Sequence, residues 1–246
     1  MAFWLLVWHV VSLCVGSELV LVSPVKVVQT LFTVIFDPDF LKTVWYSAAR
    51  ILGGFFTALT LGTVLGWVAS RFWVVETLLR PITAVIKATP VASFIILVLL
   101  WFSGKNLSVI ISMLMVFPVI YMNVLEGIRS ADEKLLEMAQ VFRLSVGKKL
   151  LYIYLPAVAP FFVSACSVSL GLCWKSGIAA EVIGTPDGSI GAVFYQAKIF
   201  LQTSELLAWT VVVVAVSVAF EKLFMLLLRL VLKKLKMEDV LNGKRA

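Results

Sequence analysis

Long apolar runs alternate with short polar segments along this chain, a pattern typical of helices that cross a membrane. An α-helix rises about 1.5 Å per residue, so about 20 apolar residues span the roughly 30 Å hydrocarbon core of a bilayer. Six candidate spans meet or approach this length, at residues 3–22, 45–69, 90–102, 107–125, 157–180 and 206–228. The pattern predicts an all-α membrane protein with about six transmembrane helices.

Two of these runs differ from the others. The run at 90–102 is short for a bilayer, so we expect it either to extend back through residues 81–89 or to enter the membrane without crossing on its own. The run at 3–22 lacks the basic amino-terminal region and the small-residue cleavage site of a signal peptide. It is therefore interpreted as a retained helix.

Composition agrees with a membrane protein. Hydrophobic residues make up 61% of the 246 residues and charged residues only 14%, whereas a soluble domain is about half apolar and a quarter charged. Three cysteines, Cys14, Cys166 and Cys173, lie inside apolar runs without a metal-binding spacing. We interpret them as packing residues and expect no metal site.

The basic residues indicate the orientation of the spans. They gather in short segments between apolar runs, which argues against a nucleic-acid surface and favours a topology signal. The opposite side receives only Lys26, Lys42, Lys105 and Lys198, so both termini are expected in the cytoplasm of a bacterial cell, with the spans in its inner membrane. Fourteen basic residues fall on the cytoplasmic side if six spans alternate: Arg71, Arg80, Lys87, Arg129, Lys134, Arg143, Lys148, Lys149, Arg229, Lys233, Lys234, Lys236, Lys244 and Arg245.

The longest charged stretch between spans covers residues 129–156. Residues 132–141 suit a short amphipathic helix, and Ser145 is an N-cap for a second helix that Pro156 limits. Such a basic helix pair either lies on an anionic membrane surface or, with Met138 and Phe142 exposed, fills a groove on a partner protein.

A spacing in this stretch resembles a known family. Glu137-x-Ala139, followed by Ile153-x-Leu155-Pro156, is similar to the EAA loop of ABC importer permeases. The resemblance covers residues 43 to 228 and implies a type I permease bundle with a coupling helix between the fourth and fifth spans. Three further segments are similar to the nitrate/taurine/sulfonate branch of the family: Gly-Ile-Arg-Ser at 127–130, Thr-Pro at 89–90 and Ala-Glu-Val-Ile-Gly at 180–184.

The resemblance implies partners and a division of labour. In that family the helix of the loop docks into a cleft of a cytoplasmic ATPase and transmits its closure to the membrane helices. The expected partners are ATPase subunits, a second permease (identical or paired), an extracytoplasmic substrate-binding protein and membrane lipid. ATP and Mg would be held by the ATPase, so this chain is expected to bind no cofactor and to be no enzyme.

Roles for individual loop residues follow from the same resemblance. Ala139 and Phe142 would be docking contacts, Glu137 a polar anchor of the loop, and Pro156 the stop that fixes the angle of the loop to the fifth span. The chain divides into residues 1–42 (first helix and external segment), 43–230 (permease core) and 231–246 (basic cytoplasmic tail).

Two positions depart from the family pattern. Arg143 stands where the family usually has the glycine that permits the turn after the coupling helix. The turn then has to form at Arg143 or at residues 144–145, and Arg143 could also favour the helix C-terminus or meet an acidic residue of the ATPase. Met138 replaces the second alanine of the motif.

A stripe of small residues marks a close helix contact. Gly54, Ala58, Gly62 and Gly66 recur every four residues and line one face of the second span. Small side chains let two helices approach closely. The neighbouring helix belongs either to the same chain or to a second permease subunit.

Three residues of the fifth span are candidates for the translocation path. Lys175, beside Trp174, is a charge deep in an apolar run, and such residues are functional candidates by default. Lys175 either attracts an anionic substrate, pairs with a group such as Glu181, or extends toward the lipid headgroups. Glu181 lies near the outer end of the span, where interfacial anchoring is the alternative to a place on the path. The glycine-rich turn 184–191 is expected to be an external connector, a gate or a contact for the binding protein.

Two other classes of function compete with an ABC permease. A membrane-embedded enzyme would be expected to show a catalytic motif, and this chain has one histidine and neither HExxH nor GxSxG. An ion-driven secondary transporter would be expected to show internal repeats and several intramembrane acids, which the sequence lacks. The substrates implied by the family are small solutes such as nitrate, taurine, other sulfonates, bicarbonate-like anions or vitamin precursors, and Lys175 favours the anions.

Overall fold

A computed structural model describes residues 2–17 and 20–235, and in these ranges the chain forms helices and no strand. A 3₁₀ turn at Gly104–Asn106 precedes α6, and a π-helical stretch at Leu150–Tyr154 joins α8 to α9. The α-helices are α1 (Ala2–Val15), α2 (Pro24–Ile35), α3 (Phe40–Arg71), α4 (Trp73–Ala88), α5 (Val91–Leu99), α6 (Leu107–Arg129), α7 (Glu133–Val141), α8 (Val146–Lys149), α9 (Leu155–Gly184), α10 (Ile190–Ile199) and α11 (Thr203–Lys234).

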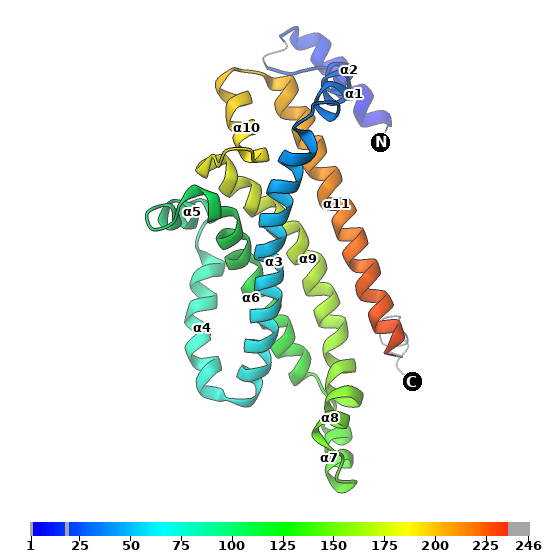
Figure 1. The fold of residues 1–246 in the computed structure, drawn as a ribbon. Coiled ribbons are helices and arrows are strands. Elements are labelled where there is room, and N and C mark those ends of the chain that lie inside the picture. Colours follow the sequence, from blue (N-terminus) through cyan, green and yellow to red (C-terminus); the bar gives the residue numbers. More distant parts are fainter. Residues whose placement is uncertain (1, 18–19, 236–246) are drawn as a thin grey trace.

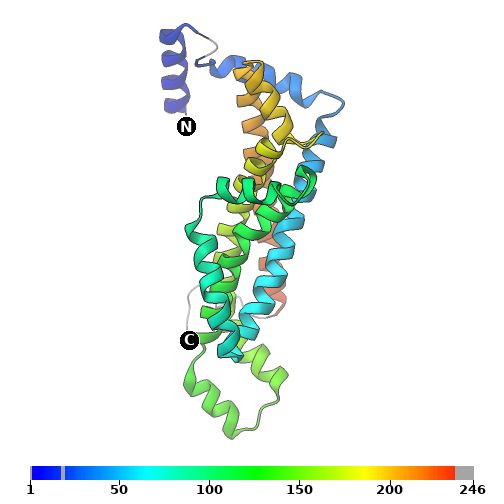
Figure 2. The ribbon, with the colours of Figure 1, turned by 90° about the vertical axis from the view of Figure 1, so that its left-hand side faces the viewer.

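Three long helices form the centre of the bundle. α6 packs along both α3 and α9, and α11 runs beside α9 (Figure 1). α4 returns from the end of α3 along α3 and α6, and α5 then turns away from it (Figures 1 and 2). The segment with α7 and α8 projects beyond the bundle at the end opposite α10. The fold therefore separates an extended loop at one end from a capped end at the other.

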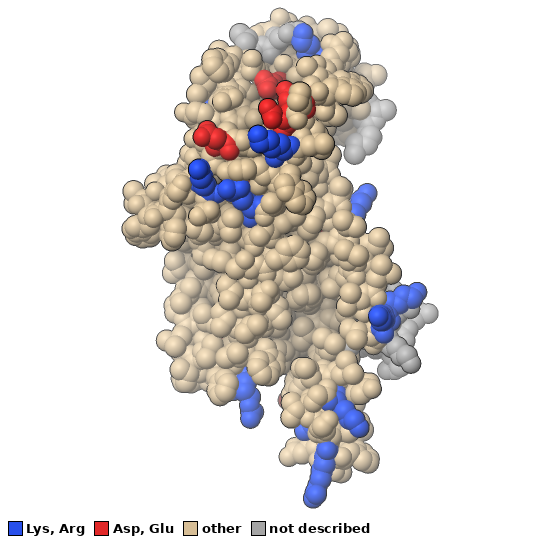
Figure 3. Space-filling view, viewed as in Figure 1, with Lys and Arg blue, Asp and Glu red and all other residues tan. Residues whose placement is uncertain are grey.

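The bundle has the dimensions of a membrane domain. α3, the segment Gly104–Arg129, the segment Val146–Gly184 and α11 are each long and apolar enough to cross a bilayer. Exposed Trp45 and Trp67 lie about 33 Å apart along α3, which suits the two interfaces where tryptophan concentrates. On the face seen in Figure 3, charged side chains gather toward the two ends and the middle is largely uncharged.

The described residues contain fewer clear spans than the expected six. Within residues 2–17 and 20–235, length and composition give four spans, or five if α4 and α5, bent by 105°, count as one. In place of the predicted span 3–22 the structure has α1, a helix of 14 residues that is about 21 Å long. Gly16 follows α1 with φ of 63°, a left-handed conformation that ends helices and suits glycine. The basic tail predicted at 231–246 continues α11 as far as Lys234, and its residues 236–246 lie outside the described chain.

The segment between the second and third predicted spans is the main correction to the topology. The sequence predicts Arg80 and Lys87 in a cytoplasmic loop, but both belong to α4, which packs along α3 and α6. This helix has only 16 residues, and its charged residues Glu76, Arg80 and Lys87 interrupt the apolar sequence, so it escapes a search for long apolar runs. α5 then begins after Pro90, where proline cannot continue the helix of α4.

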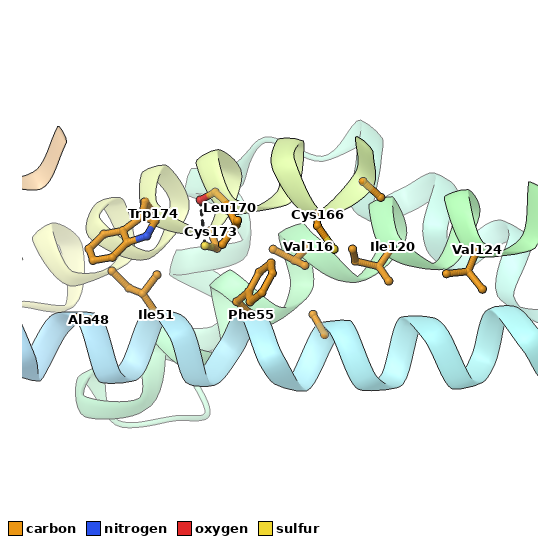
Figure 4. Packing of buried hydrophobic residues seen from close by; sticks show 12 residues of the cluster. Ala48, Ile51, Phe55, Val116, Ile120, Val124, Cys166, Leu170, Cys173 and Trp174 are labelled. Atoms are coloured by element: carbon orange, nitrogen blue, oxygen red, sulfur yellow. Dashed lines mark hydrogen bonds between the residues drawn. The ribbon is translucent and has the colours of Figure 1, made fainter. Parts of the chain in front are cut away.

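Close packing between α3 and α6 fixes the core. The stripe of Gly54, Ala58, Gly62 and Gly66 is buried and faces α6 of the same chain. A Cβ atom added at Gly62 would stand 2.9 Å from the Cβ of Ile120, so only glycine allows this approach. Beside this contact, Phe55, Val116, Ile120, Cys166 and Cys173 pack between α3, α6 and α9 (Figure 4). Both of these cysteines are free and buried in that cluster.

Candidate coupling loop and translocation face

The loop between α6 and α9 begins with a capped helix. The side chain of Asp132 accepts a hydrogen bond from the N–H of Lys134 at 2.9 Å and caps α7. Capping by aspartate satisfies one of the free N–H groups of the first turn. The short helix thus starts at a defined residue just beyond the membrane end of α6.

The C-terminal turn of α7 forms at Arg143 itself. Arg143 has φ of 49°, its N–H donates to the carbonyl of Gln140 at 3.0 Å, and the N–H of Leu144 donates to the carbonyl of Ala139 at 2.9 Å. These two bonds define a Schellman motif, in which the residue after the cap is left-handed and is usually glycine. Arg143 therefore adopts the left-handed conformation that glycine adopts without strain. For a residue with a Cβ atom this conformation costs about 1–2 kcal/mol relative to the right-handed one.

Ala139 lies inside the loop. Its side chain is fully buried and packs with Ala131, Ile153 and Leu144. Ala139 is therefore not part of the exposed surface of the loop in this structure, where it joins α7 to the start of the next helix. A larger side chain would push these two segments apart, which explains why a small residue stands here.

Other residues of α7 form the exposed surface of the loop. Met138, Val141 and Phe142 are 47%, 79% and 71% exposed, and they form an apolar surface on a segment that projects from the bundle (Figure 1). Glu137 is also exposed, and no group in the described chain bonds to it. It does not anchor the loop in this structure.

Pro156 does not stop the second helix. α8, the π-helical stretch and α9 form one helical segment of 39 residues, Val146–Gly184, with Pro156 in the first turn of α9. The N–H of Leu155 bonds to the carbonyl of Leu150, one residue further back than in an α-helix. This wider turn just before Pro156 accommodates a ring that would clash with an α-helical carbonyl. Ile153 and Leu155 therefore belong to one continuous helical segment, and Ile153 is buried.

Trp174 packs in the core rather than along an open path. It is 2% exposed and lies against Ala48 and Ile51 of α3 (Figure 4). Its indole N–H has no acceptor within the described residues. In this conformation Trp174 therefore closes the contact between α9 and α3.

Glu181 is enclosed at the end of the bundle that carries α10. Its side chain is fully buried, and its Oε2 accepts hydrogen bonds from Ser47 Oγ at 2.6 Å and from the N–H of Gly191 at 3.4 Å. The N–H of Ile190 donates to Ser47 Oγ at 2.9 Å. The carboxyl group therefore binds the N-terminus of α10, where anionic groups are favoured, and fastens it to α3. The expectation of an interfacial anchor is wrong for Glu181.

Lys175 points away from the core. Its side chain is exposed and no carboxylate of the described chain lies within ion-pair distance. On a helical wheel it falls within about 40° of Phe161, and about 21 Å further toward the outer end of α9. Val168 and Leu172, both exposed, lie between them. Pairing of Lys175 with Glu181 does not occur in this structure.

A comparison with known families identifies the chain. A family model described as a binding-protein-dependent transport system inner membrane component matches residues 58–237. This match includes the C-terminal part of α3, the loop between α6 and α9, and α11. The chain belongs to this family. It is therefore a permease subunit of an ABC importer and no enzyme.

Relatives of this permease have names that place them in one branch. SsuC of Bacillus subtilis, named as an aliphatic sulfonates transport permease, is 30% identical over 92% of this chain and 83% of its own length. TauC of Escherichia coli, a taurine transport system permease protein, is 27% identical over 87% of this chain and 80% of its length. NrtB of Synechococcus elongatus, a nitrate import permease protein, is 25% identical over 84% of each. The permease is thus of the nitrate/taurine/sulfonate type.

The permease has two largely apolar hollows with a few charged side chains that sequence reasoning missed. Two neighbouring hollows of about 380 and 410 Å³ share Lys87 and Met122. The first lies between α4, α6 and Phe161 of α9, and the second extends along α4 to Arg80. Because Phe161 and Lys175 share a face of α9, the hollows and Lys175 belong to one side of the bundle, here termed the path face. The missed signal was that Arg80 and Lys87 are seven residues apart, on one face of an amphipathic helix.

Proposed function

We propose that this permease moves a small anionic solute into the cytoplasm and that its loop at residues 129–156 couples the movement to a partner ATPase. The names of the relatives support an anion, since sulfonates, nitrate and bicarbonate are anions and taurine carries a sulfonate group. Positive charges at Lys87, Arg80 and Lys175 on the path face favour the same class.

The exposed apolar surface of α7 is the observation that carries the coupling. Met138, Val141 and Phe142 lie on a segment outside the membrane domain, where apolar exposure has no lipid to cover it. An apolar helix face of this size suits a groove on a partner. ATP and Mg are bound by that partner, and closure of its subunits displaces α7 and the helical segment that begins at Val146.

A second permease, identical or paired, covers the path face. Charged side chains at membrane depth are costly when they face lipid, by about 2.5–3.5 kcal/mol each on an insertion scale. Lys87, Glu126 and Lys175 are all exposed on this one side. A partner subunit encloses them in a hydrated path, and two-fold pairing is the usual arrangement of such subunits. Lipid instead covers the apolar outer surface of α11.

The remaining partners and the orientation follow from the same proposal. The end with α7 faces the cytoplasm of a bacterial cell, together with the basic end of α11. The opposite end, with α10 and the turn before it, faces the substrate-binding protein. This proposal places the C-terminus in the cytoplasm, whereas α1, with 14 residues, lies at the opposite end of the molecule in the structure (Figure 1).

The direct test replaces the most exposed aromatic residue of the loop. Phe142→Ala should lower ATP-driven uptake about tenfold or more in the complex with its ATPase and binding protein, because buried aromatic anchors dominate docking energies. Phe36→Ala, equally exposed at the other end of the molecule (81%), is the matched control and should leave uptake unchanged. Unchanged uptake and unchanged co-purification of the ATPase with Phe142→Ala would rule out the proposed coupling surface.

A further inference from the structure

Lys87 stands deep in the membrane domain without a charge partner. It lies about 21 Å along α4 from Trp73, which is 75% exposed at the end where α3 and α4 meet. Its Nζ contacts the sulfur of Met122 at 3.4 Å, and no carboxylate of the described residues is within ion-pair distance. An ammonium group at this depth needs water, a counter-charge or an anionic ligand.

The surroundings of Lys87 provide room and further donors. The two hollows that share Lys87 reach Asn123 and Glu126 on α6 and Arg80 on α4. Asn123 donates one amide N–H to the carbonyl of Val119 at 2.8 Å, which leaves its second N–H for another acceptor. Arg80 lies two turns below Lys87, on the same face of α4 and about 10 Å nearer to Trp73. Lys87 lines both hollows, Asn123 lines the first and Arg80 the second, so the three donor groups follow one another along the path face.

We propose that Lys87 and Arg80, with the free amide N–H of Asn123, form an inner anion-binding site on the exit half of the path. This inference rests on the proposed function and names the group that the site recognises: an oxoanion such as a sulfonate or nitrate, whose oxygens accept bonds from Lys87 and Asn123 in the first hollow and from Lys87 and Arg80 in the second. Lys175 stands further out on the path face, so the solute would meet Lys175 first, Lys87 next and Arg80 last. Because Lys175, Lys87 and Arg80 follow one another along the path face, the anion can leave one positive charge as it approaches the next.

Glu126 offers the competing explanation for Lys87. It lines the same hollow from α6, and a small movement of both side chains would bring them together as a structural ion pair. If Lys87 and Glu126 form only a structural ion pair, neutralising both leaves no unpaired charge and uptake should recover. If Lys87 binds the anion, the double variant still lacks the positive charge and uptake should stay slow. A double substitution therefore separates the two explanations.

The experiment uses the full importer, with its ATPase and binding protein, in liposomes. Uptake of radiolabelled taurine, butanesulfonate and nitrate is measured for the wild type, Lys87→Met, Lys87→Arg and Lys87→Met combined with Glu126→Gln. Lys26→Met, an exposed lysine of α2 at the opposite end, is the matched control. If the wild type takes up no anion, the proposed function fails before the inference is tested.

We expect Lys87→Met to lower the maximal uptake rate about tenfold or more, and Lys87→Arg to keep most of it. The concentration for half-maximal uptake should stay unchanged, because the binding protein captures the solute outside. The double variant should remain as slow as Lys87→Met. Wild-type rates for Lys87→Met, or recovery of the rate in the double variant, would overturn the inference. If Lys87→Met does not assemble, Lys87→Gln, which keeps a polar side chain, is measured in its place.

Discussion

Single residues carry much of the strain and the polar burial of this permease. Arg143 holds a left-handed turn that suits glycine, and Glu181 holds a fully buried carboxyl group whose Oε1 has no partner in the described part of the chain. Both lie at the ends of helices, where backbone groups need partners from outside the helix. Substitutions at these two positions should therefore act in opposite directions.

Arg143→Gly should stabilise the end of α7. Glycine adopts the left-handed conformation without the clash of a Cβ atom, so about 1 kcal/mol should be gained. Slower hydrogen exchange at the amides of Arg143 and Leu144, which close the turn, is the expected result. Gln140→Gly, placed within the right-handed helix, should instead speed exchange, because glycine costs about 1 kcal/mol there. Faster exchange in Arg143→Gly would contradict a left-handed turn.

Glu181→Ala should destabilise the outer end of the bundle. The substitution leaves the buried Ser47 hydroxyl and the N–H of Gly191 without their acceptor, and each buried unsatisfied group costs about 1–3 kcal/mol. Thermal unfolding of the purified permease in detergent should shift down by several degrees, and less for Glu181→Gln, which keeps an oxygen acceptor. Glu133→Ala, at an exposed position, is the control. An equal shift for Glu133→Ala and Glu181→Ala would argue against the network.

At the scale of elements, the sequence predicted the positions of the long helices better than the connections between helices. The long apolar runs correspond to α3, α6, α9 and α11, since length and hydropathy alone identify a span. The reversal at α4 and α5 could not be read in this way, because α4 carries Arg80 and Lys87 among its apolar residues. The π-helical turn before Pro156 was equally hidden, because only the neighbouring backbone decides whether proline stops or widens a helix.

The contact between α3 and α6 gives a prediction for neighbouring glycines. Gly54→Ala should destabilise the bundle, because the new Cβ atom would stand 2.8 Å from the Cβ of Ser112 and against the backbone carbonyl of Val109. Gly53→Ala faces open space and should be neutral or slightly stabilising, since alanine favours a helix. Thermal unfolding in detergent compares the two. A lower transition for Gly53→Ala than for Gly54→Ala would contradict the packing of α3 on α6.

At the scale of the whole molecule, the sequence predicted the coupling loop but not most of the path face. The coupling loop was found from residue spacing, because its motif lies within one short segment. The exposed surface of that loop was assigned less well, since Ala139 is buried and Glu137 is free. The path face was largely missed, because it combines residues from α4, α6 and α9 that only the folded chain brings together.

Water should reach the path face of the assembled importer and not the outer face of α11. Leu172→Cys, between Phe161 and Lys175 on α9, should react with a membrane-impermeant thiol reagent. Val214→Cys, 56% exposed on α11, should face lipid and react far more slowly. The native Cys166 and Cys173 are buried, and the exposed Cys14 is replaced by serine in both variants to keep the background low. Mass measurement of the labelled protein distinguishes the two variants, and faster labelling of Val214→Cys would place the path elsewhere.

The continuous helical segment Val146–Gly184 connects the two ends of the permease and can act as a lever between them. Its 39 residues extend about 58 Å, from the exposed loop at one end to the Glu181 network at the other. A tilt of about 10° around its centre would displace each end by about 5 Å in opposite directions. Since Glu181 ties that end to α10 and α3, the same swing would carry the outer cap with it. Under the proposed coupling, a small rotation at the loop is expected to open the bundle at the α10 end.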